Sequence, residues 1–287
     1  MATVDTFHQR LRGRFGHLTR SQQHIVSYLL SHYDEAAFLP AADLARRLNI
    51  SEATVVRCAR AIGFNGYPEL RRSLQDLFRS RAAPPAARLR RRLATLKDGH
   101  VLLKTVDMEL KYLAEVPHSV QAESFDRAVR LILKARRVFT FGLGPARLLP
   151  ELLDLRLRRF GFYTVCITES GRDMLEKLAL LERGDVVVAA AFFRVTPELA
   201  SLLDHAATQG APVILITDTL ELPLREHAHV ILAARRGPIS SFHSLVVPMT
   251  IINALILAVA LARPKQTMAS LNLLQRLRAA SGLDTLE

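Results

Sequence analysis

The chain has 287 residues, 49% hydrophobic and 23% charged, a length and composition that fit two globular domains and exclude a disordered chain. The formal net charge is +12, and most of it lies in residues 1–100, which carry 17 Lys and Arg against eight Asp and Glu; the remaining 187 residues carry 22 against 19. The basic N-terminal part predicts a polyanionic partner such as DNA, with a merely solubilising arginine surface as the alternative.

The cysteine content and the apolar runs indicate the cellular compartment in which the protein is expected. Cys58 and Cys166 are the two cysteines, both inside apolar patterns, which excludes a disulfide scaffold and fits a reducing cytoplasm. The first residues lack the apolar core of a signal peptide. Leu245–Ala262 approaches membrane-spanning length but contains proline, threonine and asparagine, so we expect a buried core or interface helix. We therefore expect a cytoplasmic protein with no membrane partner, no metal site and no cofactor.

Residues 18–80 have an all-helical pattern. Apolar residues recur at spacings of three and four, with capping residues before the helices and Gly63 after one of them. A proline pair and an arginine cluster in Arg81–Arg92 then predict a linker, with a helix restarting after Pro85. The expected helices are Thr19–His32, Pro40–Leu48, Glu52–Ile62 and Pro68–Arg81.

The segment Asp43–Arg60, DLARRLNISEATVVRCAR, predicts a helix-turn-helix. Two short helices that cross steeply need a small residue at the crossing, and Ala45 supplies it. Asn49 is one of the few non-glycine residues that accept the left-handed conformation of the turn, and Ser51 can cap the next helix. Four residues at spacings of three and four predict the inward face of that helix: Val55, Cys58, Ala59 and Ile62.

The opposite face of the second helix is the predicted DNA contact. We expect Arg57 to read a guanine and Arg60, one turn further, to lie near a phosphate. The alternative is an ordinary amphipathic pair with a solvated basic face. The predicted DNA-binding residues are Ser51, Glu52, Ala53, Val56, Arg57, Arg60 and Tyr67.

Residues 18–79 resemble the helix-turn-helix domain of the RpiR (MurR/RpiR) family of bacterial regulators. The resemblance rests on LTRSQQHIVSYLL, on LARRLNISEATVVRCARAIGF and on NGYPELRRSL, which contains the ending Gly63, Phe64, Gly66, Tyr67 and Glu69. It implies that this domain binds an operator as a dimer. It also implies a second domain of the sugar-isomerase (SIS) fold that senses phosphosugars.

After residue 100 the pattern changes to short β-branched runs that alternate with helical segments, which predicts a five-stranded, parallel, doubly wound sheet of flavodoxin-like type. We expect residues 1–80 to form the DNA-binding domain, 81–114 a linker and connecting helix, and 115–287 the sensing and dimerisation domain. The expected strands are Val138–Phe141, Tyr163–Ile167, Val186–Ala191, Val213–Thr217 and His229–Ala233. The expected helices are Ser124–Ala135, Pro145–Phe160, Arg172–Glu182, Pro197–Gln209 and a short piece near Pro223–His227.

Residues 115–265 resemble a SIS domain, in which loops after the strands hold the ligand. Gly142 to Arg147, GLGPAR, follows the first strand and opens a helix, an arrangement that admits an anion, although a plain tight turn is the alternative. The chain departs from the family pattern at Ala146, where phosphosugar-binding members carry a serine. It departs again in 191–196, AFFRVT, where the Ser-x-Ser-Gly-x-Thr loop keeps only Thr196.

These departures predict weak or no binding of common hexose phosphates, with any anionic effector depending chiefly on Arg194, Arg147 and Thr196. Thr168, Glu169 and His243 also lie where such sites gather polar groups, each being more often a cap or loop residue. The predicted effector-binding residues are Gly142, Gly144, Ala146, Arg147, Ser170, Arg194, Thr196, Ser240 and Ser241.

Together these patterns predict a sequence-specific transcription regulator. Its SIS domain would sense a small polar metabolite, a sugar phosphate or related carbohydrate derivative, and control a catabolic operon. We expect a homodimer or tetramer on an inverted-repeat operator of double-stranded DNA. One alternative is a regulator with a vestigial, ligand-free SIS dimerisation domain. A phosphosugar isomerase is the other, but no spacing singles out a catalytic base among Glu169, Glu198, His227, His229 and His243.

Overall fold

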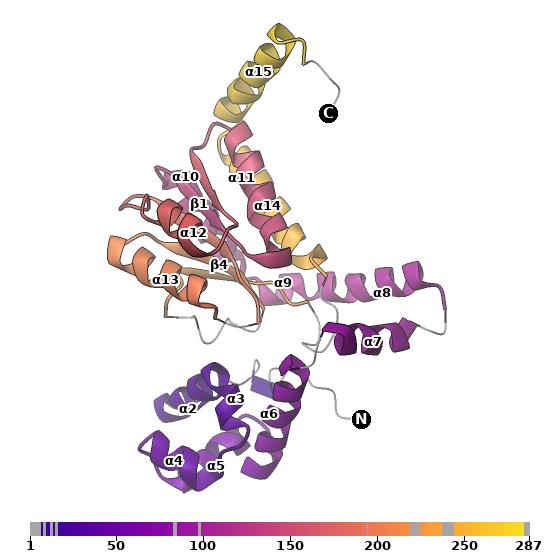
Figure 1. Ribbon diagram of the computed structural model, residues 1–287, viewed down its shortest axis with the longest axis vertical. Helices are drawn as coiled ribbons and strands as arrows, with labels where there is room; N and C mark the ends of the chain where they lie inside the picture. Colours follow the sequence, from indigo (N-terminus) through magenta and orange to yellow (C-terminus); the bar gives the residue numbers. More distant parts are fainter. Residues whose placement is uncertain are drawn as a thin grey trace. The chain divides into compact units, whose positions relative to one another are not determined.

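The computed structural model describes residues 17–82, 85–96, 99–193, 195–218, 226–236 and 244–283, together with Phe7, Arg10, Leu11, Arg14 and Leu224. The chain divides into two compact units (Figure 1). The first contains the residues up to Met108, and the second contains Glu109–Arg236 and Leu245–Glu287.

The first unit is helical, as expected. Its helices are α2 (Arg20–Ser31), α3 (Tyr33–Ala36), α4 (Ala41–Arg47), α5 (Glu52–Ala61), α6 (Tyr67–Ala82) and α7 (Pro85–Leu96), and α8 (Val101–Ala114) begins in it. Thr19 caps α2 in a capping box with Gln22, which satisfies backbone donors at both residues. The helix that was expected to restart after Pro85 is α7.

The second unit contains a five-stranded sheet made of β1 (Val138–Phe141), β2 (Thr164–Ile167), β3 (Val186–Ala190), β4 (Val213–Thr217) and β5 (Val230–Ala233). The strand order is β2-β1-β3-β4-β5, and every neighbouring pair is parallel. This is the flavodoxin-like order, so the predicted fold class is confirmed. The order reverses between β1 and β3, the place where open α/β sheets bind ligands beyond the carboxyl ends of the strands.

Helices cover both faces of the sheet (Figure 1). α10 (Ala122–Lys134), α11 (Leu148–Arg159) and α14 (Val246–Ala262) pack on one face with Val186 and Val188 of β3. α12 (Gly171–Leu178) and α13 (Pro197–Gln209) pack on the other with Val187 and Ala189. Successive side chains of a strand point to opposite faces of the sheet. Because helices cover both faces, the side chains on both must be apolar, which explains the uninterrupted hydrophobic runs in the sequence.

The apolar segment near the end of the chain is a core helix of this unit, as expected. Ile251, Leu255 and Val259 of α14 are buried against the sheet and the helices beside it. A further helix, α15 (Pro264–Ala280), follows and was not anticipated from the sequence. Within the described residues we find no single helix long and apolar enough to cross a membrane; α14 and α15 pass such a test as a pair, but they are bent by 102°.

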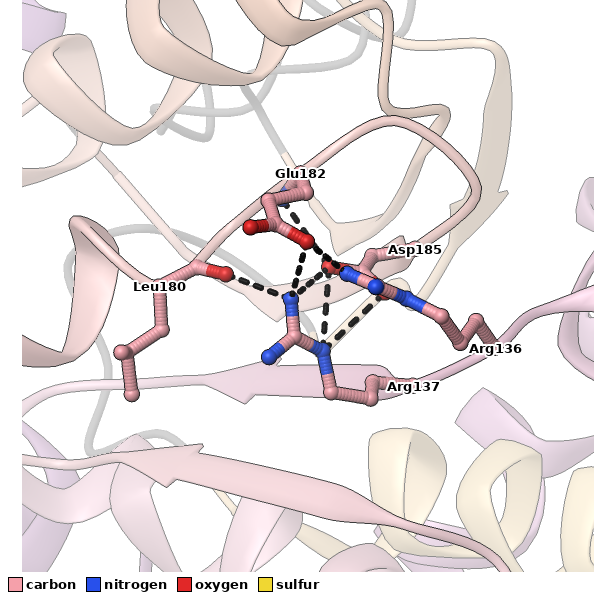
Figure 2. Close-up of polar contacts among 5 residues, drawn as sticks. All are labelled: Arg136, Arg137, Leu180, Glu182 and Asp185. Atoms are coloured by element: carbon pink, nitrogen blue, oxygen red, sulfur yellow. Dashed lines mark hydrogen bonds and ion pairs between the residues drawn. The ribbon is translucent and has the colours of Figure 1, made fainter.

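The amino ends of β1 and β3 are held together by an ion cluster (Figure 2). Asp185, whose side chain is fully buried, accepts hydrogen bonds from Arg136 and Arg137 and from the backbone N–H of Glu182. Glu182 pairs with both arginines, and Arg137 also donates to the carbonyl of Leu180 at 2.6 Å. The cluster lies at the edge of the sheet opposite the carboxyl ends of the strands.

Candidate DNA interface and effector site

The α4–turn–α5 segment has the geometry of a helix-turn-helix. Ala45 is buried, and its carbonyl accepts a 3.0 Å hydrogen bond from the N–H of Ile50, five residues later. This bond closes the turn because Asn49 adopts the left-handed conformation, with φ at 53°. The small crossing residue and the left-handed asparagine are therefore confirmed.

The second helix of the motif, α5, begins and packs as predicted. Ser51 precedes it in an extended conformation, and its side chain accepts a hydrogen bond from the N–H of Thr54 at 3.2 Å. The four residues expected to face inward are all buried: Val55, Cys58, Ala59 and Ile62. Burial also raises the pKa of the Cys58 thiol to about 12, so this cysteine behaves as an apolar core residue.

The outward face of α5 carries most of the predicted DNA-binding residues. Ser51, Glu52, Ala53, Arg57 and Arg60 are exposed, and Val56 is half-buried. Arg57 donates from Nη2 to the Thr54 hydroxyl at 3.0 Å, and that hydroxyl lies 2.7 Å from Ser51 Oγ. The start of α5 therefore presents a short polar network that steadies the Arg57 guanidinium at the surface.

The Gly-Phe-x-Gly-Tyr-x-Glu ending has a structural role in the first unit. Gly63, with φ at 94°, ends α5 in the same way as Asn49 ends α4, since the N–H of Phe64 reaches back to the carbonyl of Ala59. Glu69 accepts a 2.7 Å hydrogen bond from the N–H of Asn65 at the start of α6. These contacts fix how the chain turns from α5 into α6.

Tyr67 requires a correction. Its side chain is only 3% exposed, and its hydroxyl donates to the carbonyl of Leu39 at 2.8 Å. Burial is the largest cause that raises its pKa, to about 12. A side chain enclosed in this way cannot reach a DNA groove while the domain stays folded, so we do not retain Tyr67 as a DNA contact.

In the second unit, the loop after β1 forms a tight turn at two glycines, Gly142 and Gly144. A Cβ atom on Gly142 would lie 3.0 Å from the carbonyl oxygen of Ala146 and 3.0 Å from Pro150. Gly144 has φ at 57° and opens the short 3-10 helix η2 (Gly144–Arg147), which leads into α11. Arg147 is exposed and lies 3.7 Å from Glu151. The predicted backbone turn is therefore present, whereas its contact with a ligand remains a prediction.

Two other predicted effector residues, Ser170 and Thr196, lie after β2 and β3. Ser170 is exposed before α12 and makes no side-chain capping bond. Thr196 caps α13, since its hydroxyl accepts a hydrogen bond from the N–H of Leu199 at 3.3 Å. Arg194, Ser240, Ser241 and His243 lie outside the described residues.

Sequence analysis missed a buried ion pair at this edge of the sheet. Asp218 follows β4 directly, and Arg236 follows β5 after Ala234 and Arg235. Nη2 of Arg236 lies 2.9 Å from Oδ2 of Asp218. The guanidinium carbon lies 3.6 Å from the centre of the Phe192 ring. Burial lowers the pKa of Arg236, and Asp218 opposes that shift. Charged residues placed soon after apolar strands are the sequence signal that could have revealed this pair.

Two of the candidate acid–base groups, Glu169 and His229, have other partners in the structure. Both carboxylate oxygens of Glu169 lie 2.8 Å from Nζ of Lys177, and this hydrogen bonding is the main cause that lowers the Glu169 pKa and weakens it as a base. His229 lies at the amino end of β5, where Nδ1 accepts from the N–H of Val213 at 3.1 Å and burial lowers its pKa. Within the described part of the chain, no group of three or more His, Cys, Asp or Glu side chains is placed to hold a metal ion.

Comparisons with known families agree with both units. The family model described as "Helix-turn-helix domain, rpiR family" matches residues 6–81, and the one described as "SIS domain" matches residues 131–258. The chain is an RpiR-type transcription regulator with a SIS domain. An uncharacterized HTH-type transcriptional regulator from Haemophilus influenzae is 26% identical over 218 residues, which cover 75% of each chain. The bifunctional protein glk of Paraburkholderia xenovorans is 26% identical over 259 residues, 89% of this regulator but 40% of that protein.

Solved structures support the fold. The sugar isomerase domain of the RpiR transcription factor from Sphaerobacter thermophilus superposes with a TM-score of 0.58 at 24% identity, covering 62% of this regulator and 99% of that chain. The Vibrio vulnificus NanR protein complexed with ManNAc-6P gives a TM-score of 0.55 at 20% identity, over 94% of this regulator and 97% of that chain. At these identities the likeness is one of architecture.

Proposed function

We propose that this regulator binds an inverted-repeat operator as a homodimer and that a carbohydrate-derived effector bound to its SIS domain controls that binding. Residues 1–80 would contact DNA, 81–114 would connect the domains, and 115–287 would bind the effector and dimerise. The protein would act in the cytoplasm, without a catalytic step of its own, on a nearby catabolic operon. A dimer with a two-fold axis places two recognition helices on two half-sites, so the operator would be a palindrome.

The observation that carries the DNA-binding proposal is the exposed start of α5. Ser51 caps the helix there, and the exposed Arg57 guanidinium donates one hydrogen bond to Thr54, which leaves its other N–H groups for a base. A bidentate arginine is the most common reader of guanine in the major groove. Arg60, one turn later and exposed, would contact a phosphate. Glu52, Ala53 and Val56 would complete the contact surface.

The effector proposal rests on the carboxyl edge of the sheet. The turn at Gly142–Arg147 and the loop that ends at Thr196 follow β1 and β3, the neighbouring strands where the sheet order reverses. Ligands of open α/β sheets bind at this position. Since NanR is described with ManNAc-6P, sugar phosphates and sugar acids are the first compounds to test.

A second candidate function has one observation in its favour. Phe192 and Phe193 stand where phosphosugar-binding relatives are expected to carry hydroxyl-bearing residues, and Phe192 packs against the hydrophobic core. A SIS domain that has lost its effector and only dimerises would tolerate this change. An isomerase is less well supported, because Glu169 is held by Lys177 and His229 lies at the amino end of β5.

Selection of bound fragments from random and genomic DNA with the full chain tests this function. We expect an enriched palindrome whose affinity falls steeply as salt rises, because phosphate contacts release counterions. Repeating the binding with a panel of sugar phosphates and sugar acids then tests the effector. A chain that enriches no sequence would refute the DNA-binding role. A chain that binds its operator but ignores the whole panel would favour the dimerisation-only alternative.

A further inference from the structure

The loops that follow β3, β4 and β5 meet at the carboxylate of Asp218. Asp218 is 7% exposed and Arg236 4% exposed, so their ion pair is almost completely withdrawn from water. Oδ2 of Asp218 accepts from Arg236 at 2.9 Å, while Oδ1 accepts from the backbone N–H of Phe193 at 3.3 Å. One carboxylate therefore ties the loop after β3 to the segment after β5.

The Arg236 guanidinium has hydrogen-bonding capacity that this pair does not use. Its Nε is buried and has no hydrogen-bond partner among the residues that the structure describes. The Phe192 ring lies 3.6 Å from the guanidinium carbon and the Phe193 ring 4.8 Å from it, so aromatic contacts hold the group in place. A guanidinium offers five N–H donors in a planar fork that matches the oxygens of a carboxylate or phosphate. A buried donor without an acceptor is unfavourable, and an anion that reached it would relieve the deficit.

The loop held by Asp218 is itself strained and leads to a helix N-terminus. Phe193 has φ at 73°, a left-handed conformation that is costly for a residue with a bulky side chain. Three residues later Thr196 caps α13, a helix of 13 residues whose N-terminus adds positive potential at the same edge of the sheet. A change at Asp218 would therefore alter the hydrogen bond that holds Phe193 and, through this loop, the start of α13.

We propose that Arg236 is the receptor for the anionic group of the effector, and that Asp218 is an internal carboxylate that occupies it until a carboxylate or phosphate of a small metabolite takes its place. The inference rests on the proposed sensing role of the SIS domain. The incoming anion would engage Nη2 and Nε together, as bidentate ligands of arginine do. Asp218 would then release the N–H of Phe193, and the loop before α13 would relax.

Substitution of Asp218 with anion rescue is the first test. Asp218→Asn leaves a buried guanidinium without its counter-charge, so the melting temperature of the full chain should fall. We expect about 50 mM acetate or phosphate, compared with chloride at equal ionic strength, to restore at least about 2 °C of that loss. The double variant Asp218→Asn/Arg236→Gln lacks the receptor and should show no such rescue. Equal effects of chloride and of the other two anions on Asp218→Asn would overturn the proposal.

Asp154 provides a matched control for this experiment. Its carboxylate is also buried, and Oδ2 lies 2.8 Å from Nη2 of Arg158. The Arg158 side chain is largely exposed, so Asp154→Asn leaves the cation in water. The stability of Asp154→Asn should not depend on which anion is present. A rescue of the same size in Asp154→Asn would mean a general salt effect and would count against a site at Arg236.

The second test uses the wild-type chain and so does not depend on the folding of a variant. The Nε–H resonance of Arg236, identified by its loss in Arg236→Lys, should shift saturably on titration with glucuronate or with glucose 6-phosphate, whereas chloride should leave it in place. The two titrations separate a sugar acid from a sugar phosphate as the source of the anion. Arg236→Gln should weaken binding of the preferred compound about 10- to 100-fold.

The outcomes separate this inference from the proposed function. An Nε–H resonance unmoved by both compounds, or binding that Arg236→Gln leaves unchanged, would overturn the role of Arg236. Operator binding by the same wild-type preparation is measured alongside. If operator binding persists while the Arg236 tests are negative, the DNA-binding function is retained and only the role of Arg236 as the anion receptor is refuted.

Discussion

The hydroxyl of Tyr67 donates a 2.8 Å hydrogen bond to the backbone carbonyl of Leu39, which joins the first residue of α6 to the segment between α3 and α4. Further along α6, Gln75 donates a similar bond from Nε2 to the carbonyl of Ala37 at 3.1 Å. The glycine–tyrosine ending of the family motif therefore anchors α6 against the rest of the DNA-binding domain.

Tyr67→Phe should destabilise the first unit without changing its DNA contacts. The variant leaves the Leu39 carbonyl without its donor, a loss of about 0.5–1.5 kcal/mol in the free energy of unfolding. Urea denaturation of the full chain measures this loss. Operator affinity, measured where the protein is fully folded, should match the wild type. A large drop in affinity with unchanged stability would mean that Tyr67 touches DNA after all.

Arg57→Ala should show the opposite behaviour. The side chain is exposed and, among the described residues, hydrogen-bonds to Thr54 alone, so its loss should leave the free energy of unfolding within about 0.5 kcal/mol of the wild type. Operator binding should weaken by about 1–3 kcal/mol, mainly through one base position.

Arg60→Ala is the comparison, because a phosphate contact should weaken binding to all sequences and reduce the salt slope by about 1. Fluorescence anisotropy across a salt series with operator and scrambled duplexes measures both effects. Equal operator affinity of Arg57→Ala and wild type would contradict the assignment.

Asp185 should make the second unit sensitive to acid. Burial alone would raise the pKa of Asp185, but hydrogen bonds from Arg137, the Glu182 N–H and Arg136 outweigh it and lower the pKa below its ordinary value. A carboxylate with a depressed pKa in the folded state stabilises the protein above its unfolded pKa, about 3.9, and that stabilisation is lost as the pH falls through the folded value.

Asp185→Asn should therefore lower the free energy of unfolding at pH 7. The loss should be about 1–3 kcal/mol, because both arginines stay partly solvated. The variant should also show a flatter decline of stability below about pH 4. Thermal melts of the two proteins between neutral and acid pH measure the difference. A constant gap between the two curves over the whole range would argue against a depressed pKa at Asp185.

Assembly should depend on the exposed side of α14. Seven of its residues are buried, but Leu257 is 70% exposed and Leu261 is 81% exposed. Apolar side chains left on the surface of a domain commonly mark a partner interface, so we expect Leu261→Glu to shift the protein toward the monomer. Sedimentation velocity at micromolar concentration reports the change. Leu175→Glu, on α12 at the other face of the sheet, is the control that should leave assembly intact. A wild-type monomer would contradict the expectation outright.

The sequence alone determined those features that depend on neighbouring residues. A left-handed turn needs a residue such as Asn49, a helix start needs an acceptor such as Ser51, and a buried helix face needs apolar residues three and four apart, as at Val55 and Cys58. The alternation of apolar strands with helices likewise determined a parallel sheet covered on both faces.

The tertiary structure decided what depends on residues far apart in the chain. The motif gave no sign that Tyr67 points inward, because its hydrogen-bond partner lies 28 residues earlier. Asp218 and Arg236 stand 18 residues apart and meet only because β4 and β5 are parallel neighbours, whose carboxyl ends bring both side chains to the same edge. Local pattern specifies each helix and strand, whereas a buried ion pair forms only when packing brings the two charges together, since their attraction must then offset the cost of removing both from water.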